Sequence, residues 1–331
     1  MTNPKMEANT LLDPFVPAMA AWALVSGVST GLFEAVANGK HRSDDIAKHL
    51  DLDSDGIKRL LDILSCLGYI KSRDGDYDLT EVSRNTLLEN SSHKLKNWVR
   101  FCRIQLQALE QLESTLTGGN CVDLQALMEK PDGLYIHQLA MAETAAPAAD
   151  WIAENIPVQK GSRLMLDIGG SHGIYSSAIS RMNPQMRAEV LELPNVIETA
   201  RNVARDLGTD DLVTHIEGDI LKTELRNDYD LVFMSNLIHH IPEELLIRVI
   251  RQIYNHINPG GTIAIWDFSE AEGEPELVSS AFSLFFYMTS KARCYSLEEI
   301  EQLLSDAGFA HFSAIRPPAP SPHALYIARR P

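Results

Sequence analysis

The chain has 331 residues, of which 45% are hydrophobic and 22% are charged, and its formal net charge is −16 at pH 7. This composition is ordinary for a globular protein, and the length predicts roughly two domains, each with its own core. The negative charge argues against general binding to nucleic-acid phosphates. No apolar run approaches the ~20 residues that a membrane span needs, so we expect neither a nucleic acid nor a membrane as partner.

The N-terminus and the cysteines favour a cytoplasmic protein. Residues 1–9 are polar and lack the apolar core of a signal peptide, so we expect no export. The four cysteines, Cys66, Cys102, Cys121 and Cys294, are far apart and show no Cys-x-x-Cys or cysteine–histidine ligand spacing. We therefore expect free thiols and no structural metal.

The first part of the chain, residues 11–150, is predicted to be mostly helical. Helices are expected over residues 18–37, 43–50, 54–67, 94–117 and 134–154. Ser43 and Ser54 are the expected N-caps of the second and third of these helices. Two short apolar runs then flank the turn Arg73-Asp74-Gly75-Asp76, which predicts a β-hairpin. Helix, helix and hairpin in this order outline a winged helix.

A winged helix can read DNA, or it can serve as a packing or dimerisation module. Residues 41–84 contain seven Lys and Arg against ten Asp and Glu, a net charge of −3 (7 − 10). The basic surface that a DNA reader needs is missing, so dimerisation is the preferred interpretation. A winged-helix transcriptional regulator remains a distant alternative.

After residue 163, short apolar strands alternate with helices. Strands are expected over residues 163–168, 188–192, 213–217, 229–234, 262–267, 310–316 and 324–328. Helices are expected over residues 174–182, 196–207, 243–257 and 296–307. This alternation predicts an α/β fold, with a mostly parallel, Rossmann-like sheet of seven strands and helices on both faces.

The first of these strands ends in a glycine-rich turn, Asp-Ile-Gly-Gly-Ser-His-Gly, at residues 167–173. Strand, tight turn and helix N-terminus form a nucleotide-sized pocket at the carboxyl edge of a parallel sheet. A dinucleotide fingerprint needs glycines at 169, 171 and 174, but positions 171 and 174 are Ser171 and Ile174, which disfavours NAD. The turn instead resembles the Asp-x-Gly-x-Gly-x-Gly of class I S-adenosylmethionine-dependent methyltransferases. Ser171 is tolerated in place of glycine if its backbone stays at negative φ.

Acidic side chains close the next two strands. Glu192 stands at the end of the second strand, where a carboxylate can accept hydrogen bonds from both ribose hydroxyls. Asp219 follows the third strand and can accept from an adenine amino group, with Ile220 against the ring. A single acidic strand end is usually only a solvated cap. Three on consecutive strands, counting Asp167, favour a binding edge.

A histidine pair, His239 and His240, follows the fourth strand and precedes a helix that begins at Pro242. A histidine at this edge can act as a general base, because its pKa lies near working pH, or it can be purely structural. Asp267 ends the fifth strand and either orients the imidazole or is a solvated cap. The apolar residues 279–289 are typical of a core or dimer surface, or of a slot for an aromatic substrate.

Taken together, residues 11–331 resemble the small-molecule O-methyltransferases, which include the plant caffeate and acetylserotonin enzymes and bacterial natural-product methyltransferases. Besides the glycine-rich turn, the shared motifs are Leu191-Glu192-Leu193-Pro194, Gly218-Asp219, Leu237-Ile238-His239-His240, Pro259-Gly260-Gly261, Ser296-Leu297-Glu298-Glu299 and Ala307-Gly308-Phe309. The resemblance implies a winged-helix dimerisation domain over residues 1–95. It also implies connecting helices that contribute to the substrate pocket over 96–150, and a catalytic domain over 151–331.

The same resemblance implies His239 as the base and Asp267 as the residue that orients it. Cofactor contacts are expected from Asp167, Gly169, Gly170, Ser171, Gly173, Glu192, Leu193, Asp219, Ile220, Ser235 and Asn236. Substrate contacts are expected from Met141, His240, Trp266, Phe285 and Met288. Two residues near the base depart from the plant members, in which an aspartate takes the place of His240 and a second glutamate that of Cys294.

The expected activity is methyl transfer from S-adenosylmethionine to a hydroxyl of a small, aromatic metabolite in secondary metabolism, leaving S-adenosylhomocysteine. The resemblance also implies an intertwined homodimer formed by the N-terminal domain. No metal is expected, because the sulfonium is already an excellent leaving group and no suitable carboxylate cluster is evident. The close alternative keeps the fold and the cofactor for N- or C-methylation, or for a reaction that transfers no methyl group.

Overall fold

The computed structural model describes residues 14–128, 132–225, 229–270, 273–318 and 321–331. The chain divides into two compact units, one ending at Gln107 and the other running from Ala108 to Pro331. None of the described helices is long and apolar enough to cross a membrane. The division into parts 1–95, 96–150 and 151–331 stays a prediction.

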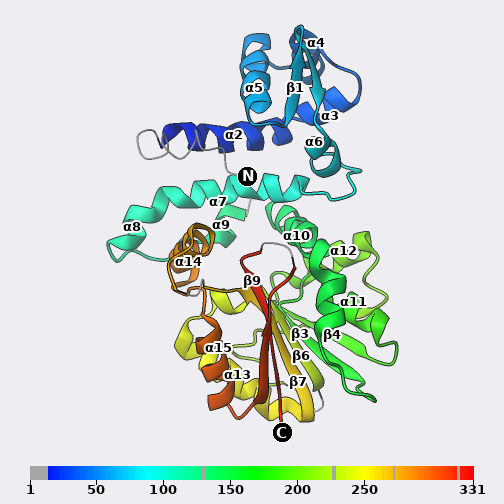
Figure 1. Ribbon diagram of the computed structural model, residues 1–331, viewed down its shortest axis with the longest axis vertical. Coiled ribbons are helices and arrows are strands. Elements are labelled where there is room, and N and C mark those ends of the chain that lie inside the picture. The colour runs from blue at the N-terminus through cyan, green and yellow to red at the C-terminus, as the bar shows by residue number, and fades with distance from the viewer. Residues whose placement is uncertain (1–13, 129–131, 226–228, 271–272, 319–320) are drawn as a thin grey trace. The chain divides into compact units, whose positions relative to one another are not determined.

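The first unit contains helices and one hairpin (Figure 1): α2 (Phe15–Ser29), α3 (Leu32–Ala37), α4 (Ser43–Leu50), α5 (Ser54–Cys66), β1 (Ile70–Arg73), β2 (Asp76–Leu79), α6 (Glu81–Thr86) and α7 (Lys96–Ala108), whose last residue falls in the second unit. The hairpin prediction is confirmed, because Asp74 and Gly75 both have positive φ, 53° and 81°, as a tight two-residue turn requires. The core is formed by apolar residues of α2 to α5 and of the hairpin, among them Leu32 and Leu61.

Two details of this unit differ from the prediction. The single helix expected over residues 18–37 is two helices, because Gly31 has a φ of 80° and breaks the ladder of hydrogen bonds. The cap of α5 is Asp53 rather than Ser54, and its carboxylate accepts a hydrogen bond from the Gly56 N–H at 2.7 Å. Ser43 is the first helical residue of α4 and does not cap it.

The second unit begins with short helices and then alternates strands with helices. Its helices are η1 (Leu109–Gln111), α8 (Leu112–Leu116), α9 (Leu124–Met128), α10 (Gly133–Asn155), α11 (Ile174–Met182), α12 (Ile197–Leu207), η2 (Ile238–His240), α13 (Glu243–His256), α14 (Leu277–Ser290) and α15 (Leu297–Asp306). Its strands are β3 (Leu164–Ile168), β4 (Arg187–Glu192), β5 (Val213–Glu217), β6 (Tyr229–Ser235), β7 (Ile257–Phe268), β8 (Ala310–Ile315) and β9 (His323–Arg329).

These seven strands form one sheet in the order β5-β4-β3-β6-β7-β9-β8, which confirms the predicted Rossmann-like fold. The first five are parallel, and β9 is antiparallel to both of its neighbours. Helices α13 and α15 pack on one face, and α10 and α11 pack on the other (Figure 1). The strands are buried on both faces, which explains their nearly continuous apolar sequences.

Strand β7 begins five residues earlier than predicted. The segment Pro259-Gly260-Gly261, expected to be a turn before the strand, lies within it. The Gly260 N–H donates to the Arg330 carbonyl at 2.8 Å, and the Arg330 N–H donates to the Gly261 carbonyl at 3.0 Å. These bonds to the last residues of the chain extend the pairing past the glycines.

Candidate functional site

The carboxyl ends of the parallel strands bring the predicted site residues to one edge of the sheet. Asp167 lies in β3, Glu192 closes β4 and Asp219 follows β5. Ser235 closes β6, and Asp267 lies one residue before the end of β7. In an open parallel sheet this edge is where ligands bind, at the point where the strand order reverses.

The glycine-rich turn after β3 is built around the buried carboxylate of Asp167. One oxygen, Oδ2, accepts a hydrogen bond from the Ser176 hydroxyl, while Oδ1 is buried without a partner among the described residues. Burial raises the pKa of Asp167 to about 7. A Cβ at Gly170 would lie 2.3 Å from this carboxyl group, so only glycine fits there. Gly169 and Gly173 have φ of 70° and 67°, which glycine adopts without strain.

Ser171 does not meet the condition of a negative φ under which a serine was to be tolerated here, because its φ is +48°. Its N–H donates to Glu192 Oε1 at 2.9 Å, and its carbonyl faces His215 Nε2 at 2.7 Å. Its hydroxyl bonds to the Gln138 side chain of α10. The turn is thus tethered in three directions, and these contacts hold a non-glycine residue in a backbone region that costs of order 1 kcal/mol.

The two acidic strand ends lie in different surroundings. Glu192 is buried, and burial raises its pKa. Its second oxygen accepts from the N–H of Leu193 at 3.2 Å. Asp219 is partly exposed, and burial acts to raise its pKa. The hydrogen bonds from Lys222 and the Leu221 N–H, together with the charge of Lys222, outweigh this and lower it. Ile220, beside Asp219, is buried.

Asn236 and His323 close the edge between β6 and the last strand. Asn236 has a φ of 49°, its N–H donates to the Trp266 carbonyl at 2.8 Å, and its Oδ1 faces His323 Nε2 at 2.8 Å. His323 stacks on the Trp266 ring with centroids 5.0 Å apart. Sequence reasoning missed His323 and Gln138, since neither belongs to a motif and each approaches the edge only through the fold.

His239 and Asp267 form a buried pair, 3% and 0% exposed. His239 Nδ1 is hydrogen-bonded to Asp267 Oδ1. Oδ2 of the same carboxylate accepts from the N–H groups of Leu237 and Ile238, both at 2.9 Å, and Oδ1 accepts from the N–H of Phe268 at 2.7 Å. The carboxylate therefore fixes the backbone turn that carries the histidine as well as the imidazole itself.

This arrangement determines which ring nitrogen of His239 carries the proton. The Asp267 oxygens act as acceptors for three backbone N–H groups, so Nδ1 is the donor in the pair and Nε2 carries the lone pair. Within the described residues, Nε2 has no hydrogen-bond partner. A neutral imidazole with a fixed Nδ1–H and a vacant Nε2 can accept a proton from a ligand hydroxyl.

The residues predicted to contact a substrate lie in several places. Met288 and Trp266 are buried in separate hydrophobic clusters, and Phe285 packs against the cluster of Met288. Met141 is partly exposed on α10. His240 is exposed, and its Nδ1 lies 3.0 Å from the Ser290 hydroxyl. Contact of these residues with a substrate stays a prediction.

Cys294 does not supply a second base beside His239. Its thiol is buried and lies 3.8 Å from the Ser279 carbonyl, and burial raises its pKa to about 12. The group is thus a neutral thiol at physiological pH and cannot replace a glutamate as a negative charge.

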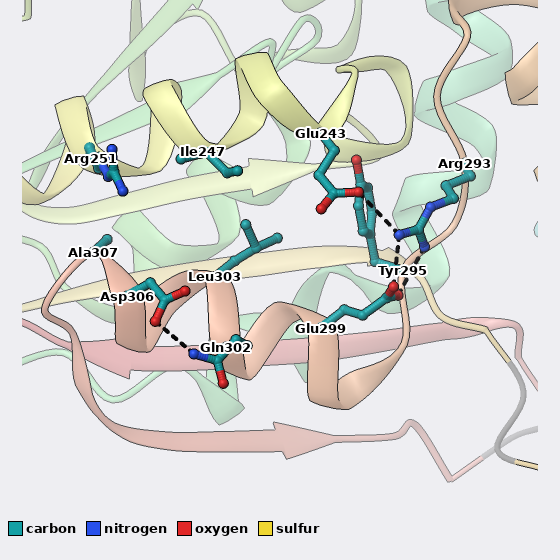
Figure 2. A pocket seen from close by; sticks show the side chains of 10 residues that line it. All are labelled: Glu243, Ile247, Arg251, Arg293, Tyr295, Glu299, Gln302, Leu303, Asp306 and Ala307. Atoms are coloured by element: carbon teal, nitrogen blue, oxygen red, sulfur yellow. Dashed lines mark hydrogen bonds and ion pairs between the residues drawn. The ribbon is translucent and has the colours of Figure 1, made fainter.

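Behind the histidine turn lies a cavity of about 220 Å³ between α13 and α15 (Figure 2). The Arg293 guanidinium donates to both carboxylate oxygens of Glu299, at 2.7 and 2.9 Å, and contacts Glu243 at 3.3 Å. Tyr295, two residues after Arg293, donates its hydroxyl to the Ile241 carbonyl at 3.2 Å. These contacts link the starts of α13 and α15 to the turn and support it from outside the site.

Two family models match the chain. One, for the O-methyltransferase domain, matches residues 123–310, which is more than half of the chain. The other, for the O-methyltransferase dimerisation domain, matches residues 16–89.

Individual relatives are similar over most of their length. The chain is 27% identical to L-tyrosine C(3)-methyltransferase of Streptomyces lavendulae, covering 80% of this chain and 76% of the relative. It is 23% identical to 3-hydroxy-5-methyl-1-naphthoate 3-O-methyltransferase of Streptomyces sahachiroi, covering 98% and 96%. The structure of human N-acetylserotonin methyltransferase in complex with S-adenosylmethionine has the same fold, with a TM-score of 0.85 and 20% identity over 100% of this chain and 99% of that one.

Proposed function

Because the chain belongs to the O-methyltransferase family, we propose that it methylates a hydroxyl of a small, aromatic metabolite, with His239 as the general base. The family match confirms the family, the enzyme class and the cofactor, S-adenosylmethionine, that the sequence predicted. The observation that carries the assignment of the base is the buried His239–Asp267 pair with its vacant Nε2. An aromatic acceptor is supported by the name of the naphthoate methyltransferase among the relatives.

The residues at the sheet edge fit this cofactor. The buried, unpartnered Asp167 Oδ1 calls for a donor, and Glu192 has acceptor capacity left for ribose hydroxyls. The residues proposed to hold the cofactor are Asp167, Gly169, Gly170, Ser171, Gly173, Glu192, Leu193, Asp219, Ile220, Ser235 and Asn236. When bound, the cofactor would supply an electrophilic methyl group on a positively charged sulfur that can leave as the neutral thioether of S-adenosylhomocysteine.

The chain's own contribution on the acceptor side is proton transfer and orientation. Nε2 of His239 takes the proton of the acceptor hydroxyl, and the imidazolium that forms is stabilised by the Asp267 carboxylate at Nδ1. The backbone N–H groups of Leu237 and Ile238 keep that carboxylate in place, so the pair needs no rearrangement during the reaction. The proton then leaves to water after the product departs.

Replacing the base tests the proposal. In His239→Ala we expect kcat with a phenolic acceptor to fall roughly 10²- to 10⁴-fold, the usual contribution of a general base. Turnover is read as S-adenosylhomocysteine release with a panel of aromatic hydroxyl compounds. Asp267→Asn should also lower kcat, because an amide can donate to Nδ1 and hold the imidazole in the wrong tautomer.

His256→Gln is the matched control, because this histidine lies at the far end of α13 and bonds only the Gln252 carbonyl in its own helix. Calorimetry should show that His239→Ala binds S-adenosylhomocysteine as tightly as the parent does. Undiminished turnover by His239→Ala would refute the general-base assignment, while no turnover by the parent on any hydroxyl acceptor would refute O-methylation.

A second candidate is methylation at carbon, favoured by the 27% identity to L-tyrosine C(3)-methyltransferase. Deprotonation of a phenol by His239 would also activate a ring carbon next to the oxygen, so the same base serves both reactions. The two are separated by the product formed from ¹³C-methyl-labelled cofactor, since NMR distinguishes a methyl group on oxygen from one on carbon.

The N-terminal unit is proposed to form a homodimer. The dimerisation-domain match supports this, and so do Phe15, Val16 and Met19 of α2, whose side chains are exposed although apolar. Light scattering after gel filtration should give twice the 36.8 kDa of one chain, and a monomer at micromolar concentration would contradict the proposal.

A further inference from the structure

The imidazole of His239 lies flat against the ring of Phe286, a residue of α14. The two ring centroids are 3.7 Å apart and the planes differ by 19°. Phe286 is only 4% exposed. A phenyl ring this close and this parallel covers one face of the histidine.

Other aromatic side chains hold Phe286 in this position. Phe268 meets it edge to face with centroids 5.3 Å apart, and Phe282, one turn earlier in α14, stacks at 5.9 Å. Phe268 also contacts His239 edge to face at 5.4 Å. Because neighbouring rings flank Phe286, it cannot turn away from the imidazole without disrupting the cluster.

We propose that Phe286 is a positioning residue for the reaction, acting through His239. Its ring holds the imidazole in the plane in which Nδ1 meets Asp267 and Nε2 stays free for the acceptor hydroxyl. Its π-face also stabilises the imidazolium formed when Nε2 takes the proton, because the face of an aromatic ring attracts a cation. The inference rests on the proposed function, since it gives Phe286 a part in that proton transfer.

The groups around the imidazole of His239 determine how much the π-face of Phe286 contributes to stabilising the imidazolium. The titratable groups facing His239 are Asp267 on β7, His240 on the same turn, with ring centroids 4.3 Å apart, and His323 on β9. Burial and the neighbouring His239 hold the pKa of His240 well below its ordinary value, and burial lowers the pKa of His323 to about 4. Both are neutral at pH 7, so Asp267 and the Phe286 face are the groups that favour a positive His239.

Three variants test the role of the π-face. Phe286→Leu keeps an apolar side chain but removes the ring, and Phe286→Tyr keeps the ring. Tyr287→Leu is the matched control, because it removes an exposed ring from the same helix, one that contacts Lys291 and lies outside the cluster around His239. All are compared for melting temperature, for kcat and KM, and for the pH profile of kcat/KM.

We expect Phe286→Leu to lower kcat roughly tenfold, the size of a desolvated cation–π contact, with KM for the cofactor unchanged. The acid limb of its pH profile should move to lower pH, because loss of the π-face favours the neutral imidazole. Phe286→Tyr and Tyr287→Leu should keep the parent's limb. A Phe286→Leu profile that is lowered without any shift, or not lowered at all, would overturn the proposal.

A readout that needs no turnover separates this inference from the proposed function. The Nδ1 proton of His239 should give a low-field NMR signal that Asp267→Asn abolishes. In Phe286→Leu this proton should exchange with water faster than in Tyr287→Leu, since the imidazole is then free to rock. Equal exchange in the two variants would sink the positioning role even if no acceptor is ever turned over.

Discussion

Ser171 has a backbone conformation that the motif around it did not predict for a serine. The sequence placed it correctly in the turn after the first strand of the sheet, but it occupies that turn at a positive φ, where local preference disfavours serine. The reason lies in residues far along the chain, since Gln138, Glu192 and His215 each hydrogen-bond to it. Such contacts are invisible to local backbone preferences and can outweigh them.

Two substitutions at this position isolate the backbone strain. Ser171→Ala and Ser171→Gly both remove the hydroxyl that bonds Gln138, but only glycine relaxes at a φ of +48°. We expect Ser171→Gly to be the more stable of the two by about 1 kcal/mol in urea unfolding. If the two variants unfold at the same urea concentration, the turn is not strained at this residue.

The surroundings of His239 also combine residues that the sequence identified with one that it did not. The sequence pointed to His239, which follows one strand, and to Asp267, which closes the next, because a parallel sheet brings such positions to one edge. It could not point to Phe286, which comes from a helix 47 positions further on (286 − 239) and meets the imidazole only after α14 packs. The apolar segment 279–289 was ambiguous among core, dimer surface and substrate slot for the same reason.

At the scale of the elements, strands were the easiest to locate. Short apolar runs separated by polar turns placed β3 to β6 to within about a residue, because strands buried on both faces need uninterrupted apolar sequence. Helix boundaries were less certain. Gly31 splits the first helix, and Asp53 caps α5 although Ser54 is also a good cap, since two adjacent capping residues cannot be ranked by pattern alone.

The start of α15 offers a test of one element. Ser296 accepts from the Glu299 N–H at 3.2 Å, and the Glu299 carboxylate accepts from the Ser296 N–H at 2.9 Å, which completes a capping box. Ser296→Ala should cost about 1 kcal/mol of unfolding free energy, measured by urea unfolding. Ser305→Ala, at an exposed position of the same helix, is the control and should cost nothing. Equal effects of the two would contradict the capping role.

At the scale of the whole molecule, buried ionisable groups set the pH dependence of stability. Burial lowers the pKa of His137 to about 4, of His172 to about 3 and of His323 to about 4. The unfolded chain takes up protons on these residues below pH ~6.5, whereas the folded chain does not. Their contribution to stability is therefore complete above pH 6.5 and is lost as the pH falls towards 4.

The raised pKa of Asp167 has the opposite effect on the pH dependence of stability. Its folded-state pKa of about 7 means that the folded chain holds a proton there, between about pH 4 and 7, that the unfolded chain has lost. This contribution weakens the fold as the pH rises through that window. The pKa values of His215 and His240 are lowered as well, and that of Glu192 is raised. Five histidines thus oppose two carboxyl groups, so we expect the unfolding free energy to fall on acidification from pH 7 to 5.

The sign is checked by urea unfolding at pH 7, 6 and 5. His172→Gln should flatten the dependence by up to about 1.4 kcal/mol per pH unit, the weight of one proton. The exposed His49→Gln serves as the control and should leave the slope of the parent. A slope unchanged in His172→Gln would show that this histidine is not excluded from protonation by the fold.

The α/β class, the glycine-rich turn and the row of acidic and histidine side chains at one sheet edge could all be predicted from the sequence. Periodicity and turn chemistry are local, and parallel strands must align their carboxyl ends, so these features follow from short stretches of chain. The φ of Ser171, the neutral thiol of Cys294 and the stacking of Phe286 on His239 became evident only in the folded chain. Each depends on burial or on contacts between distant segments, which no local pattern encodes.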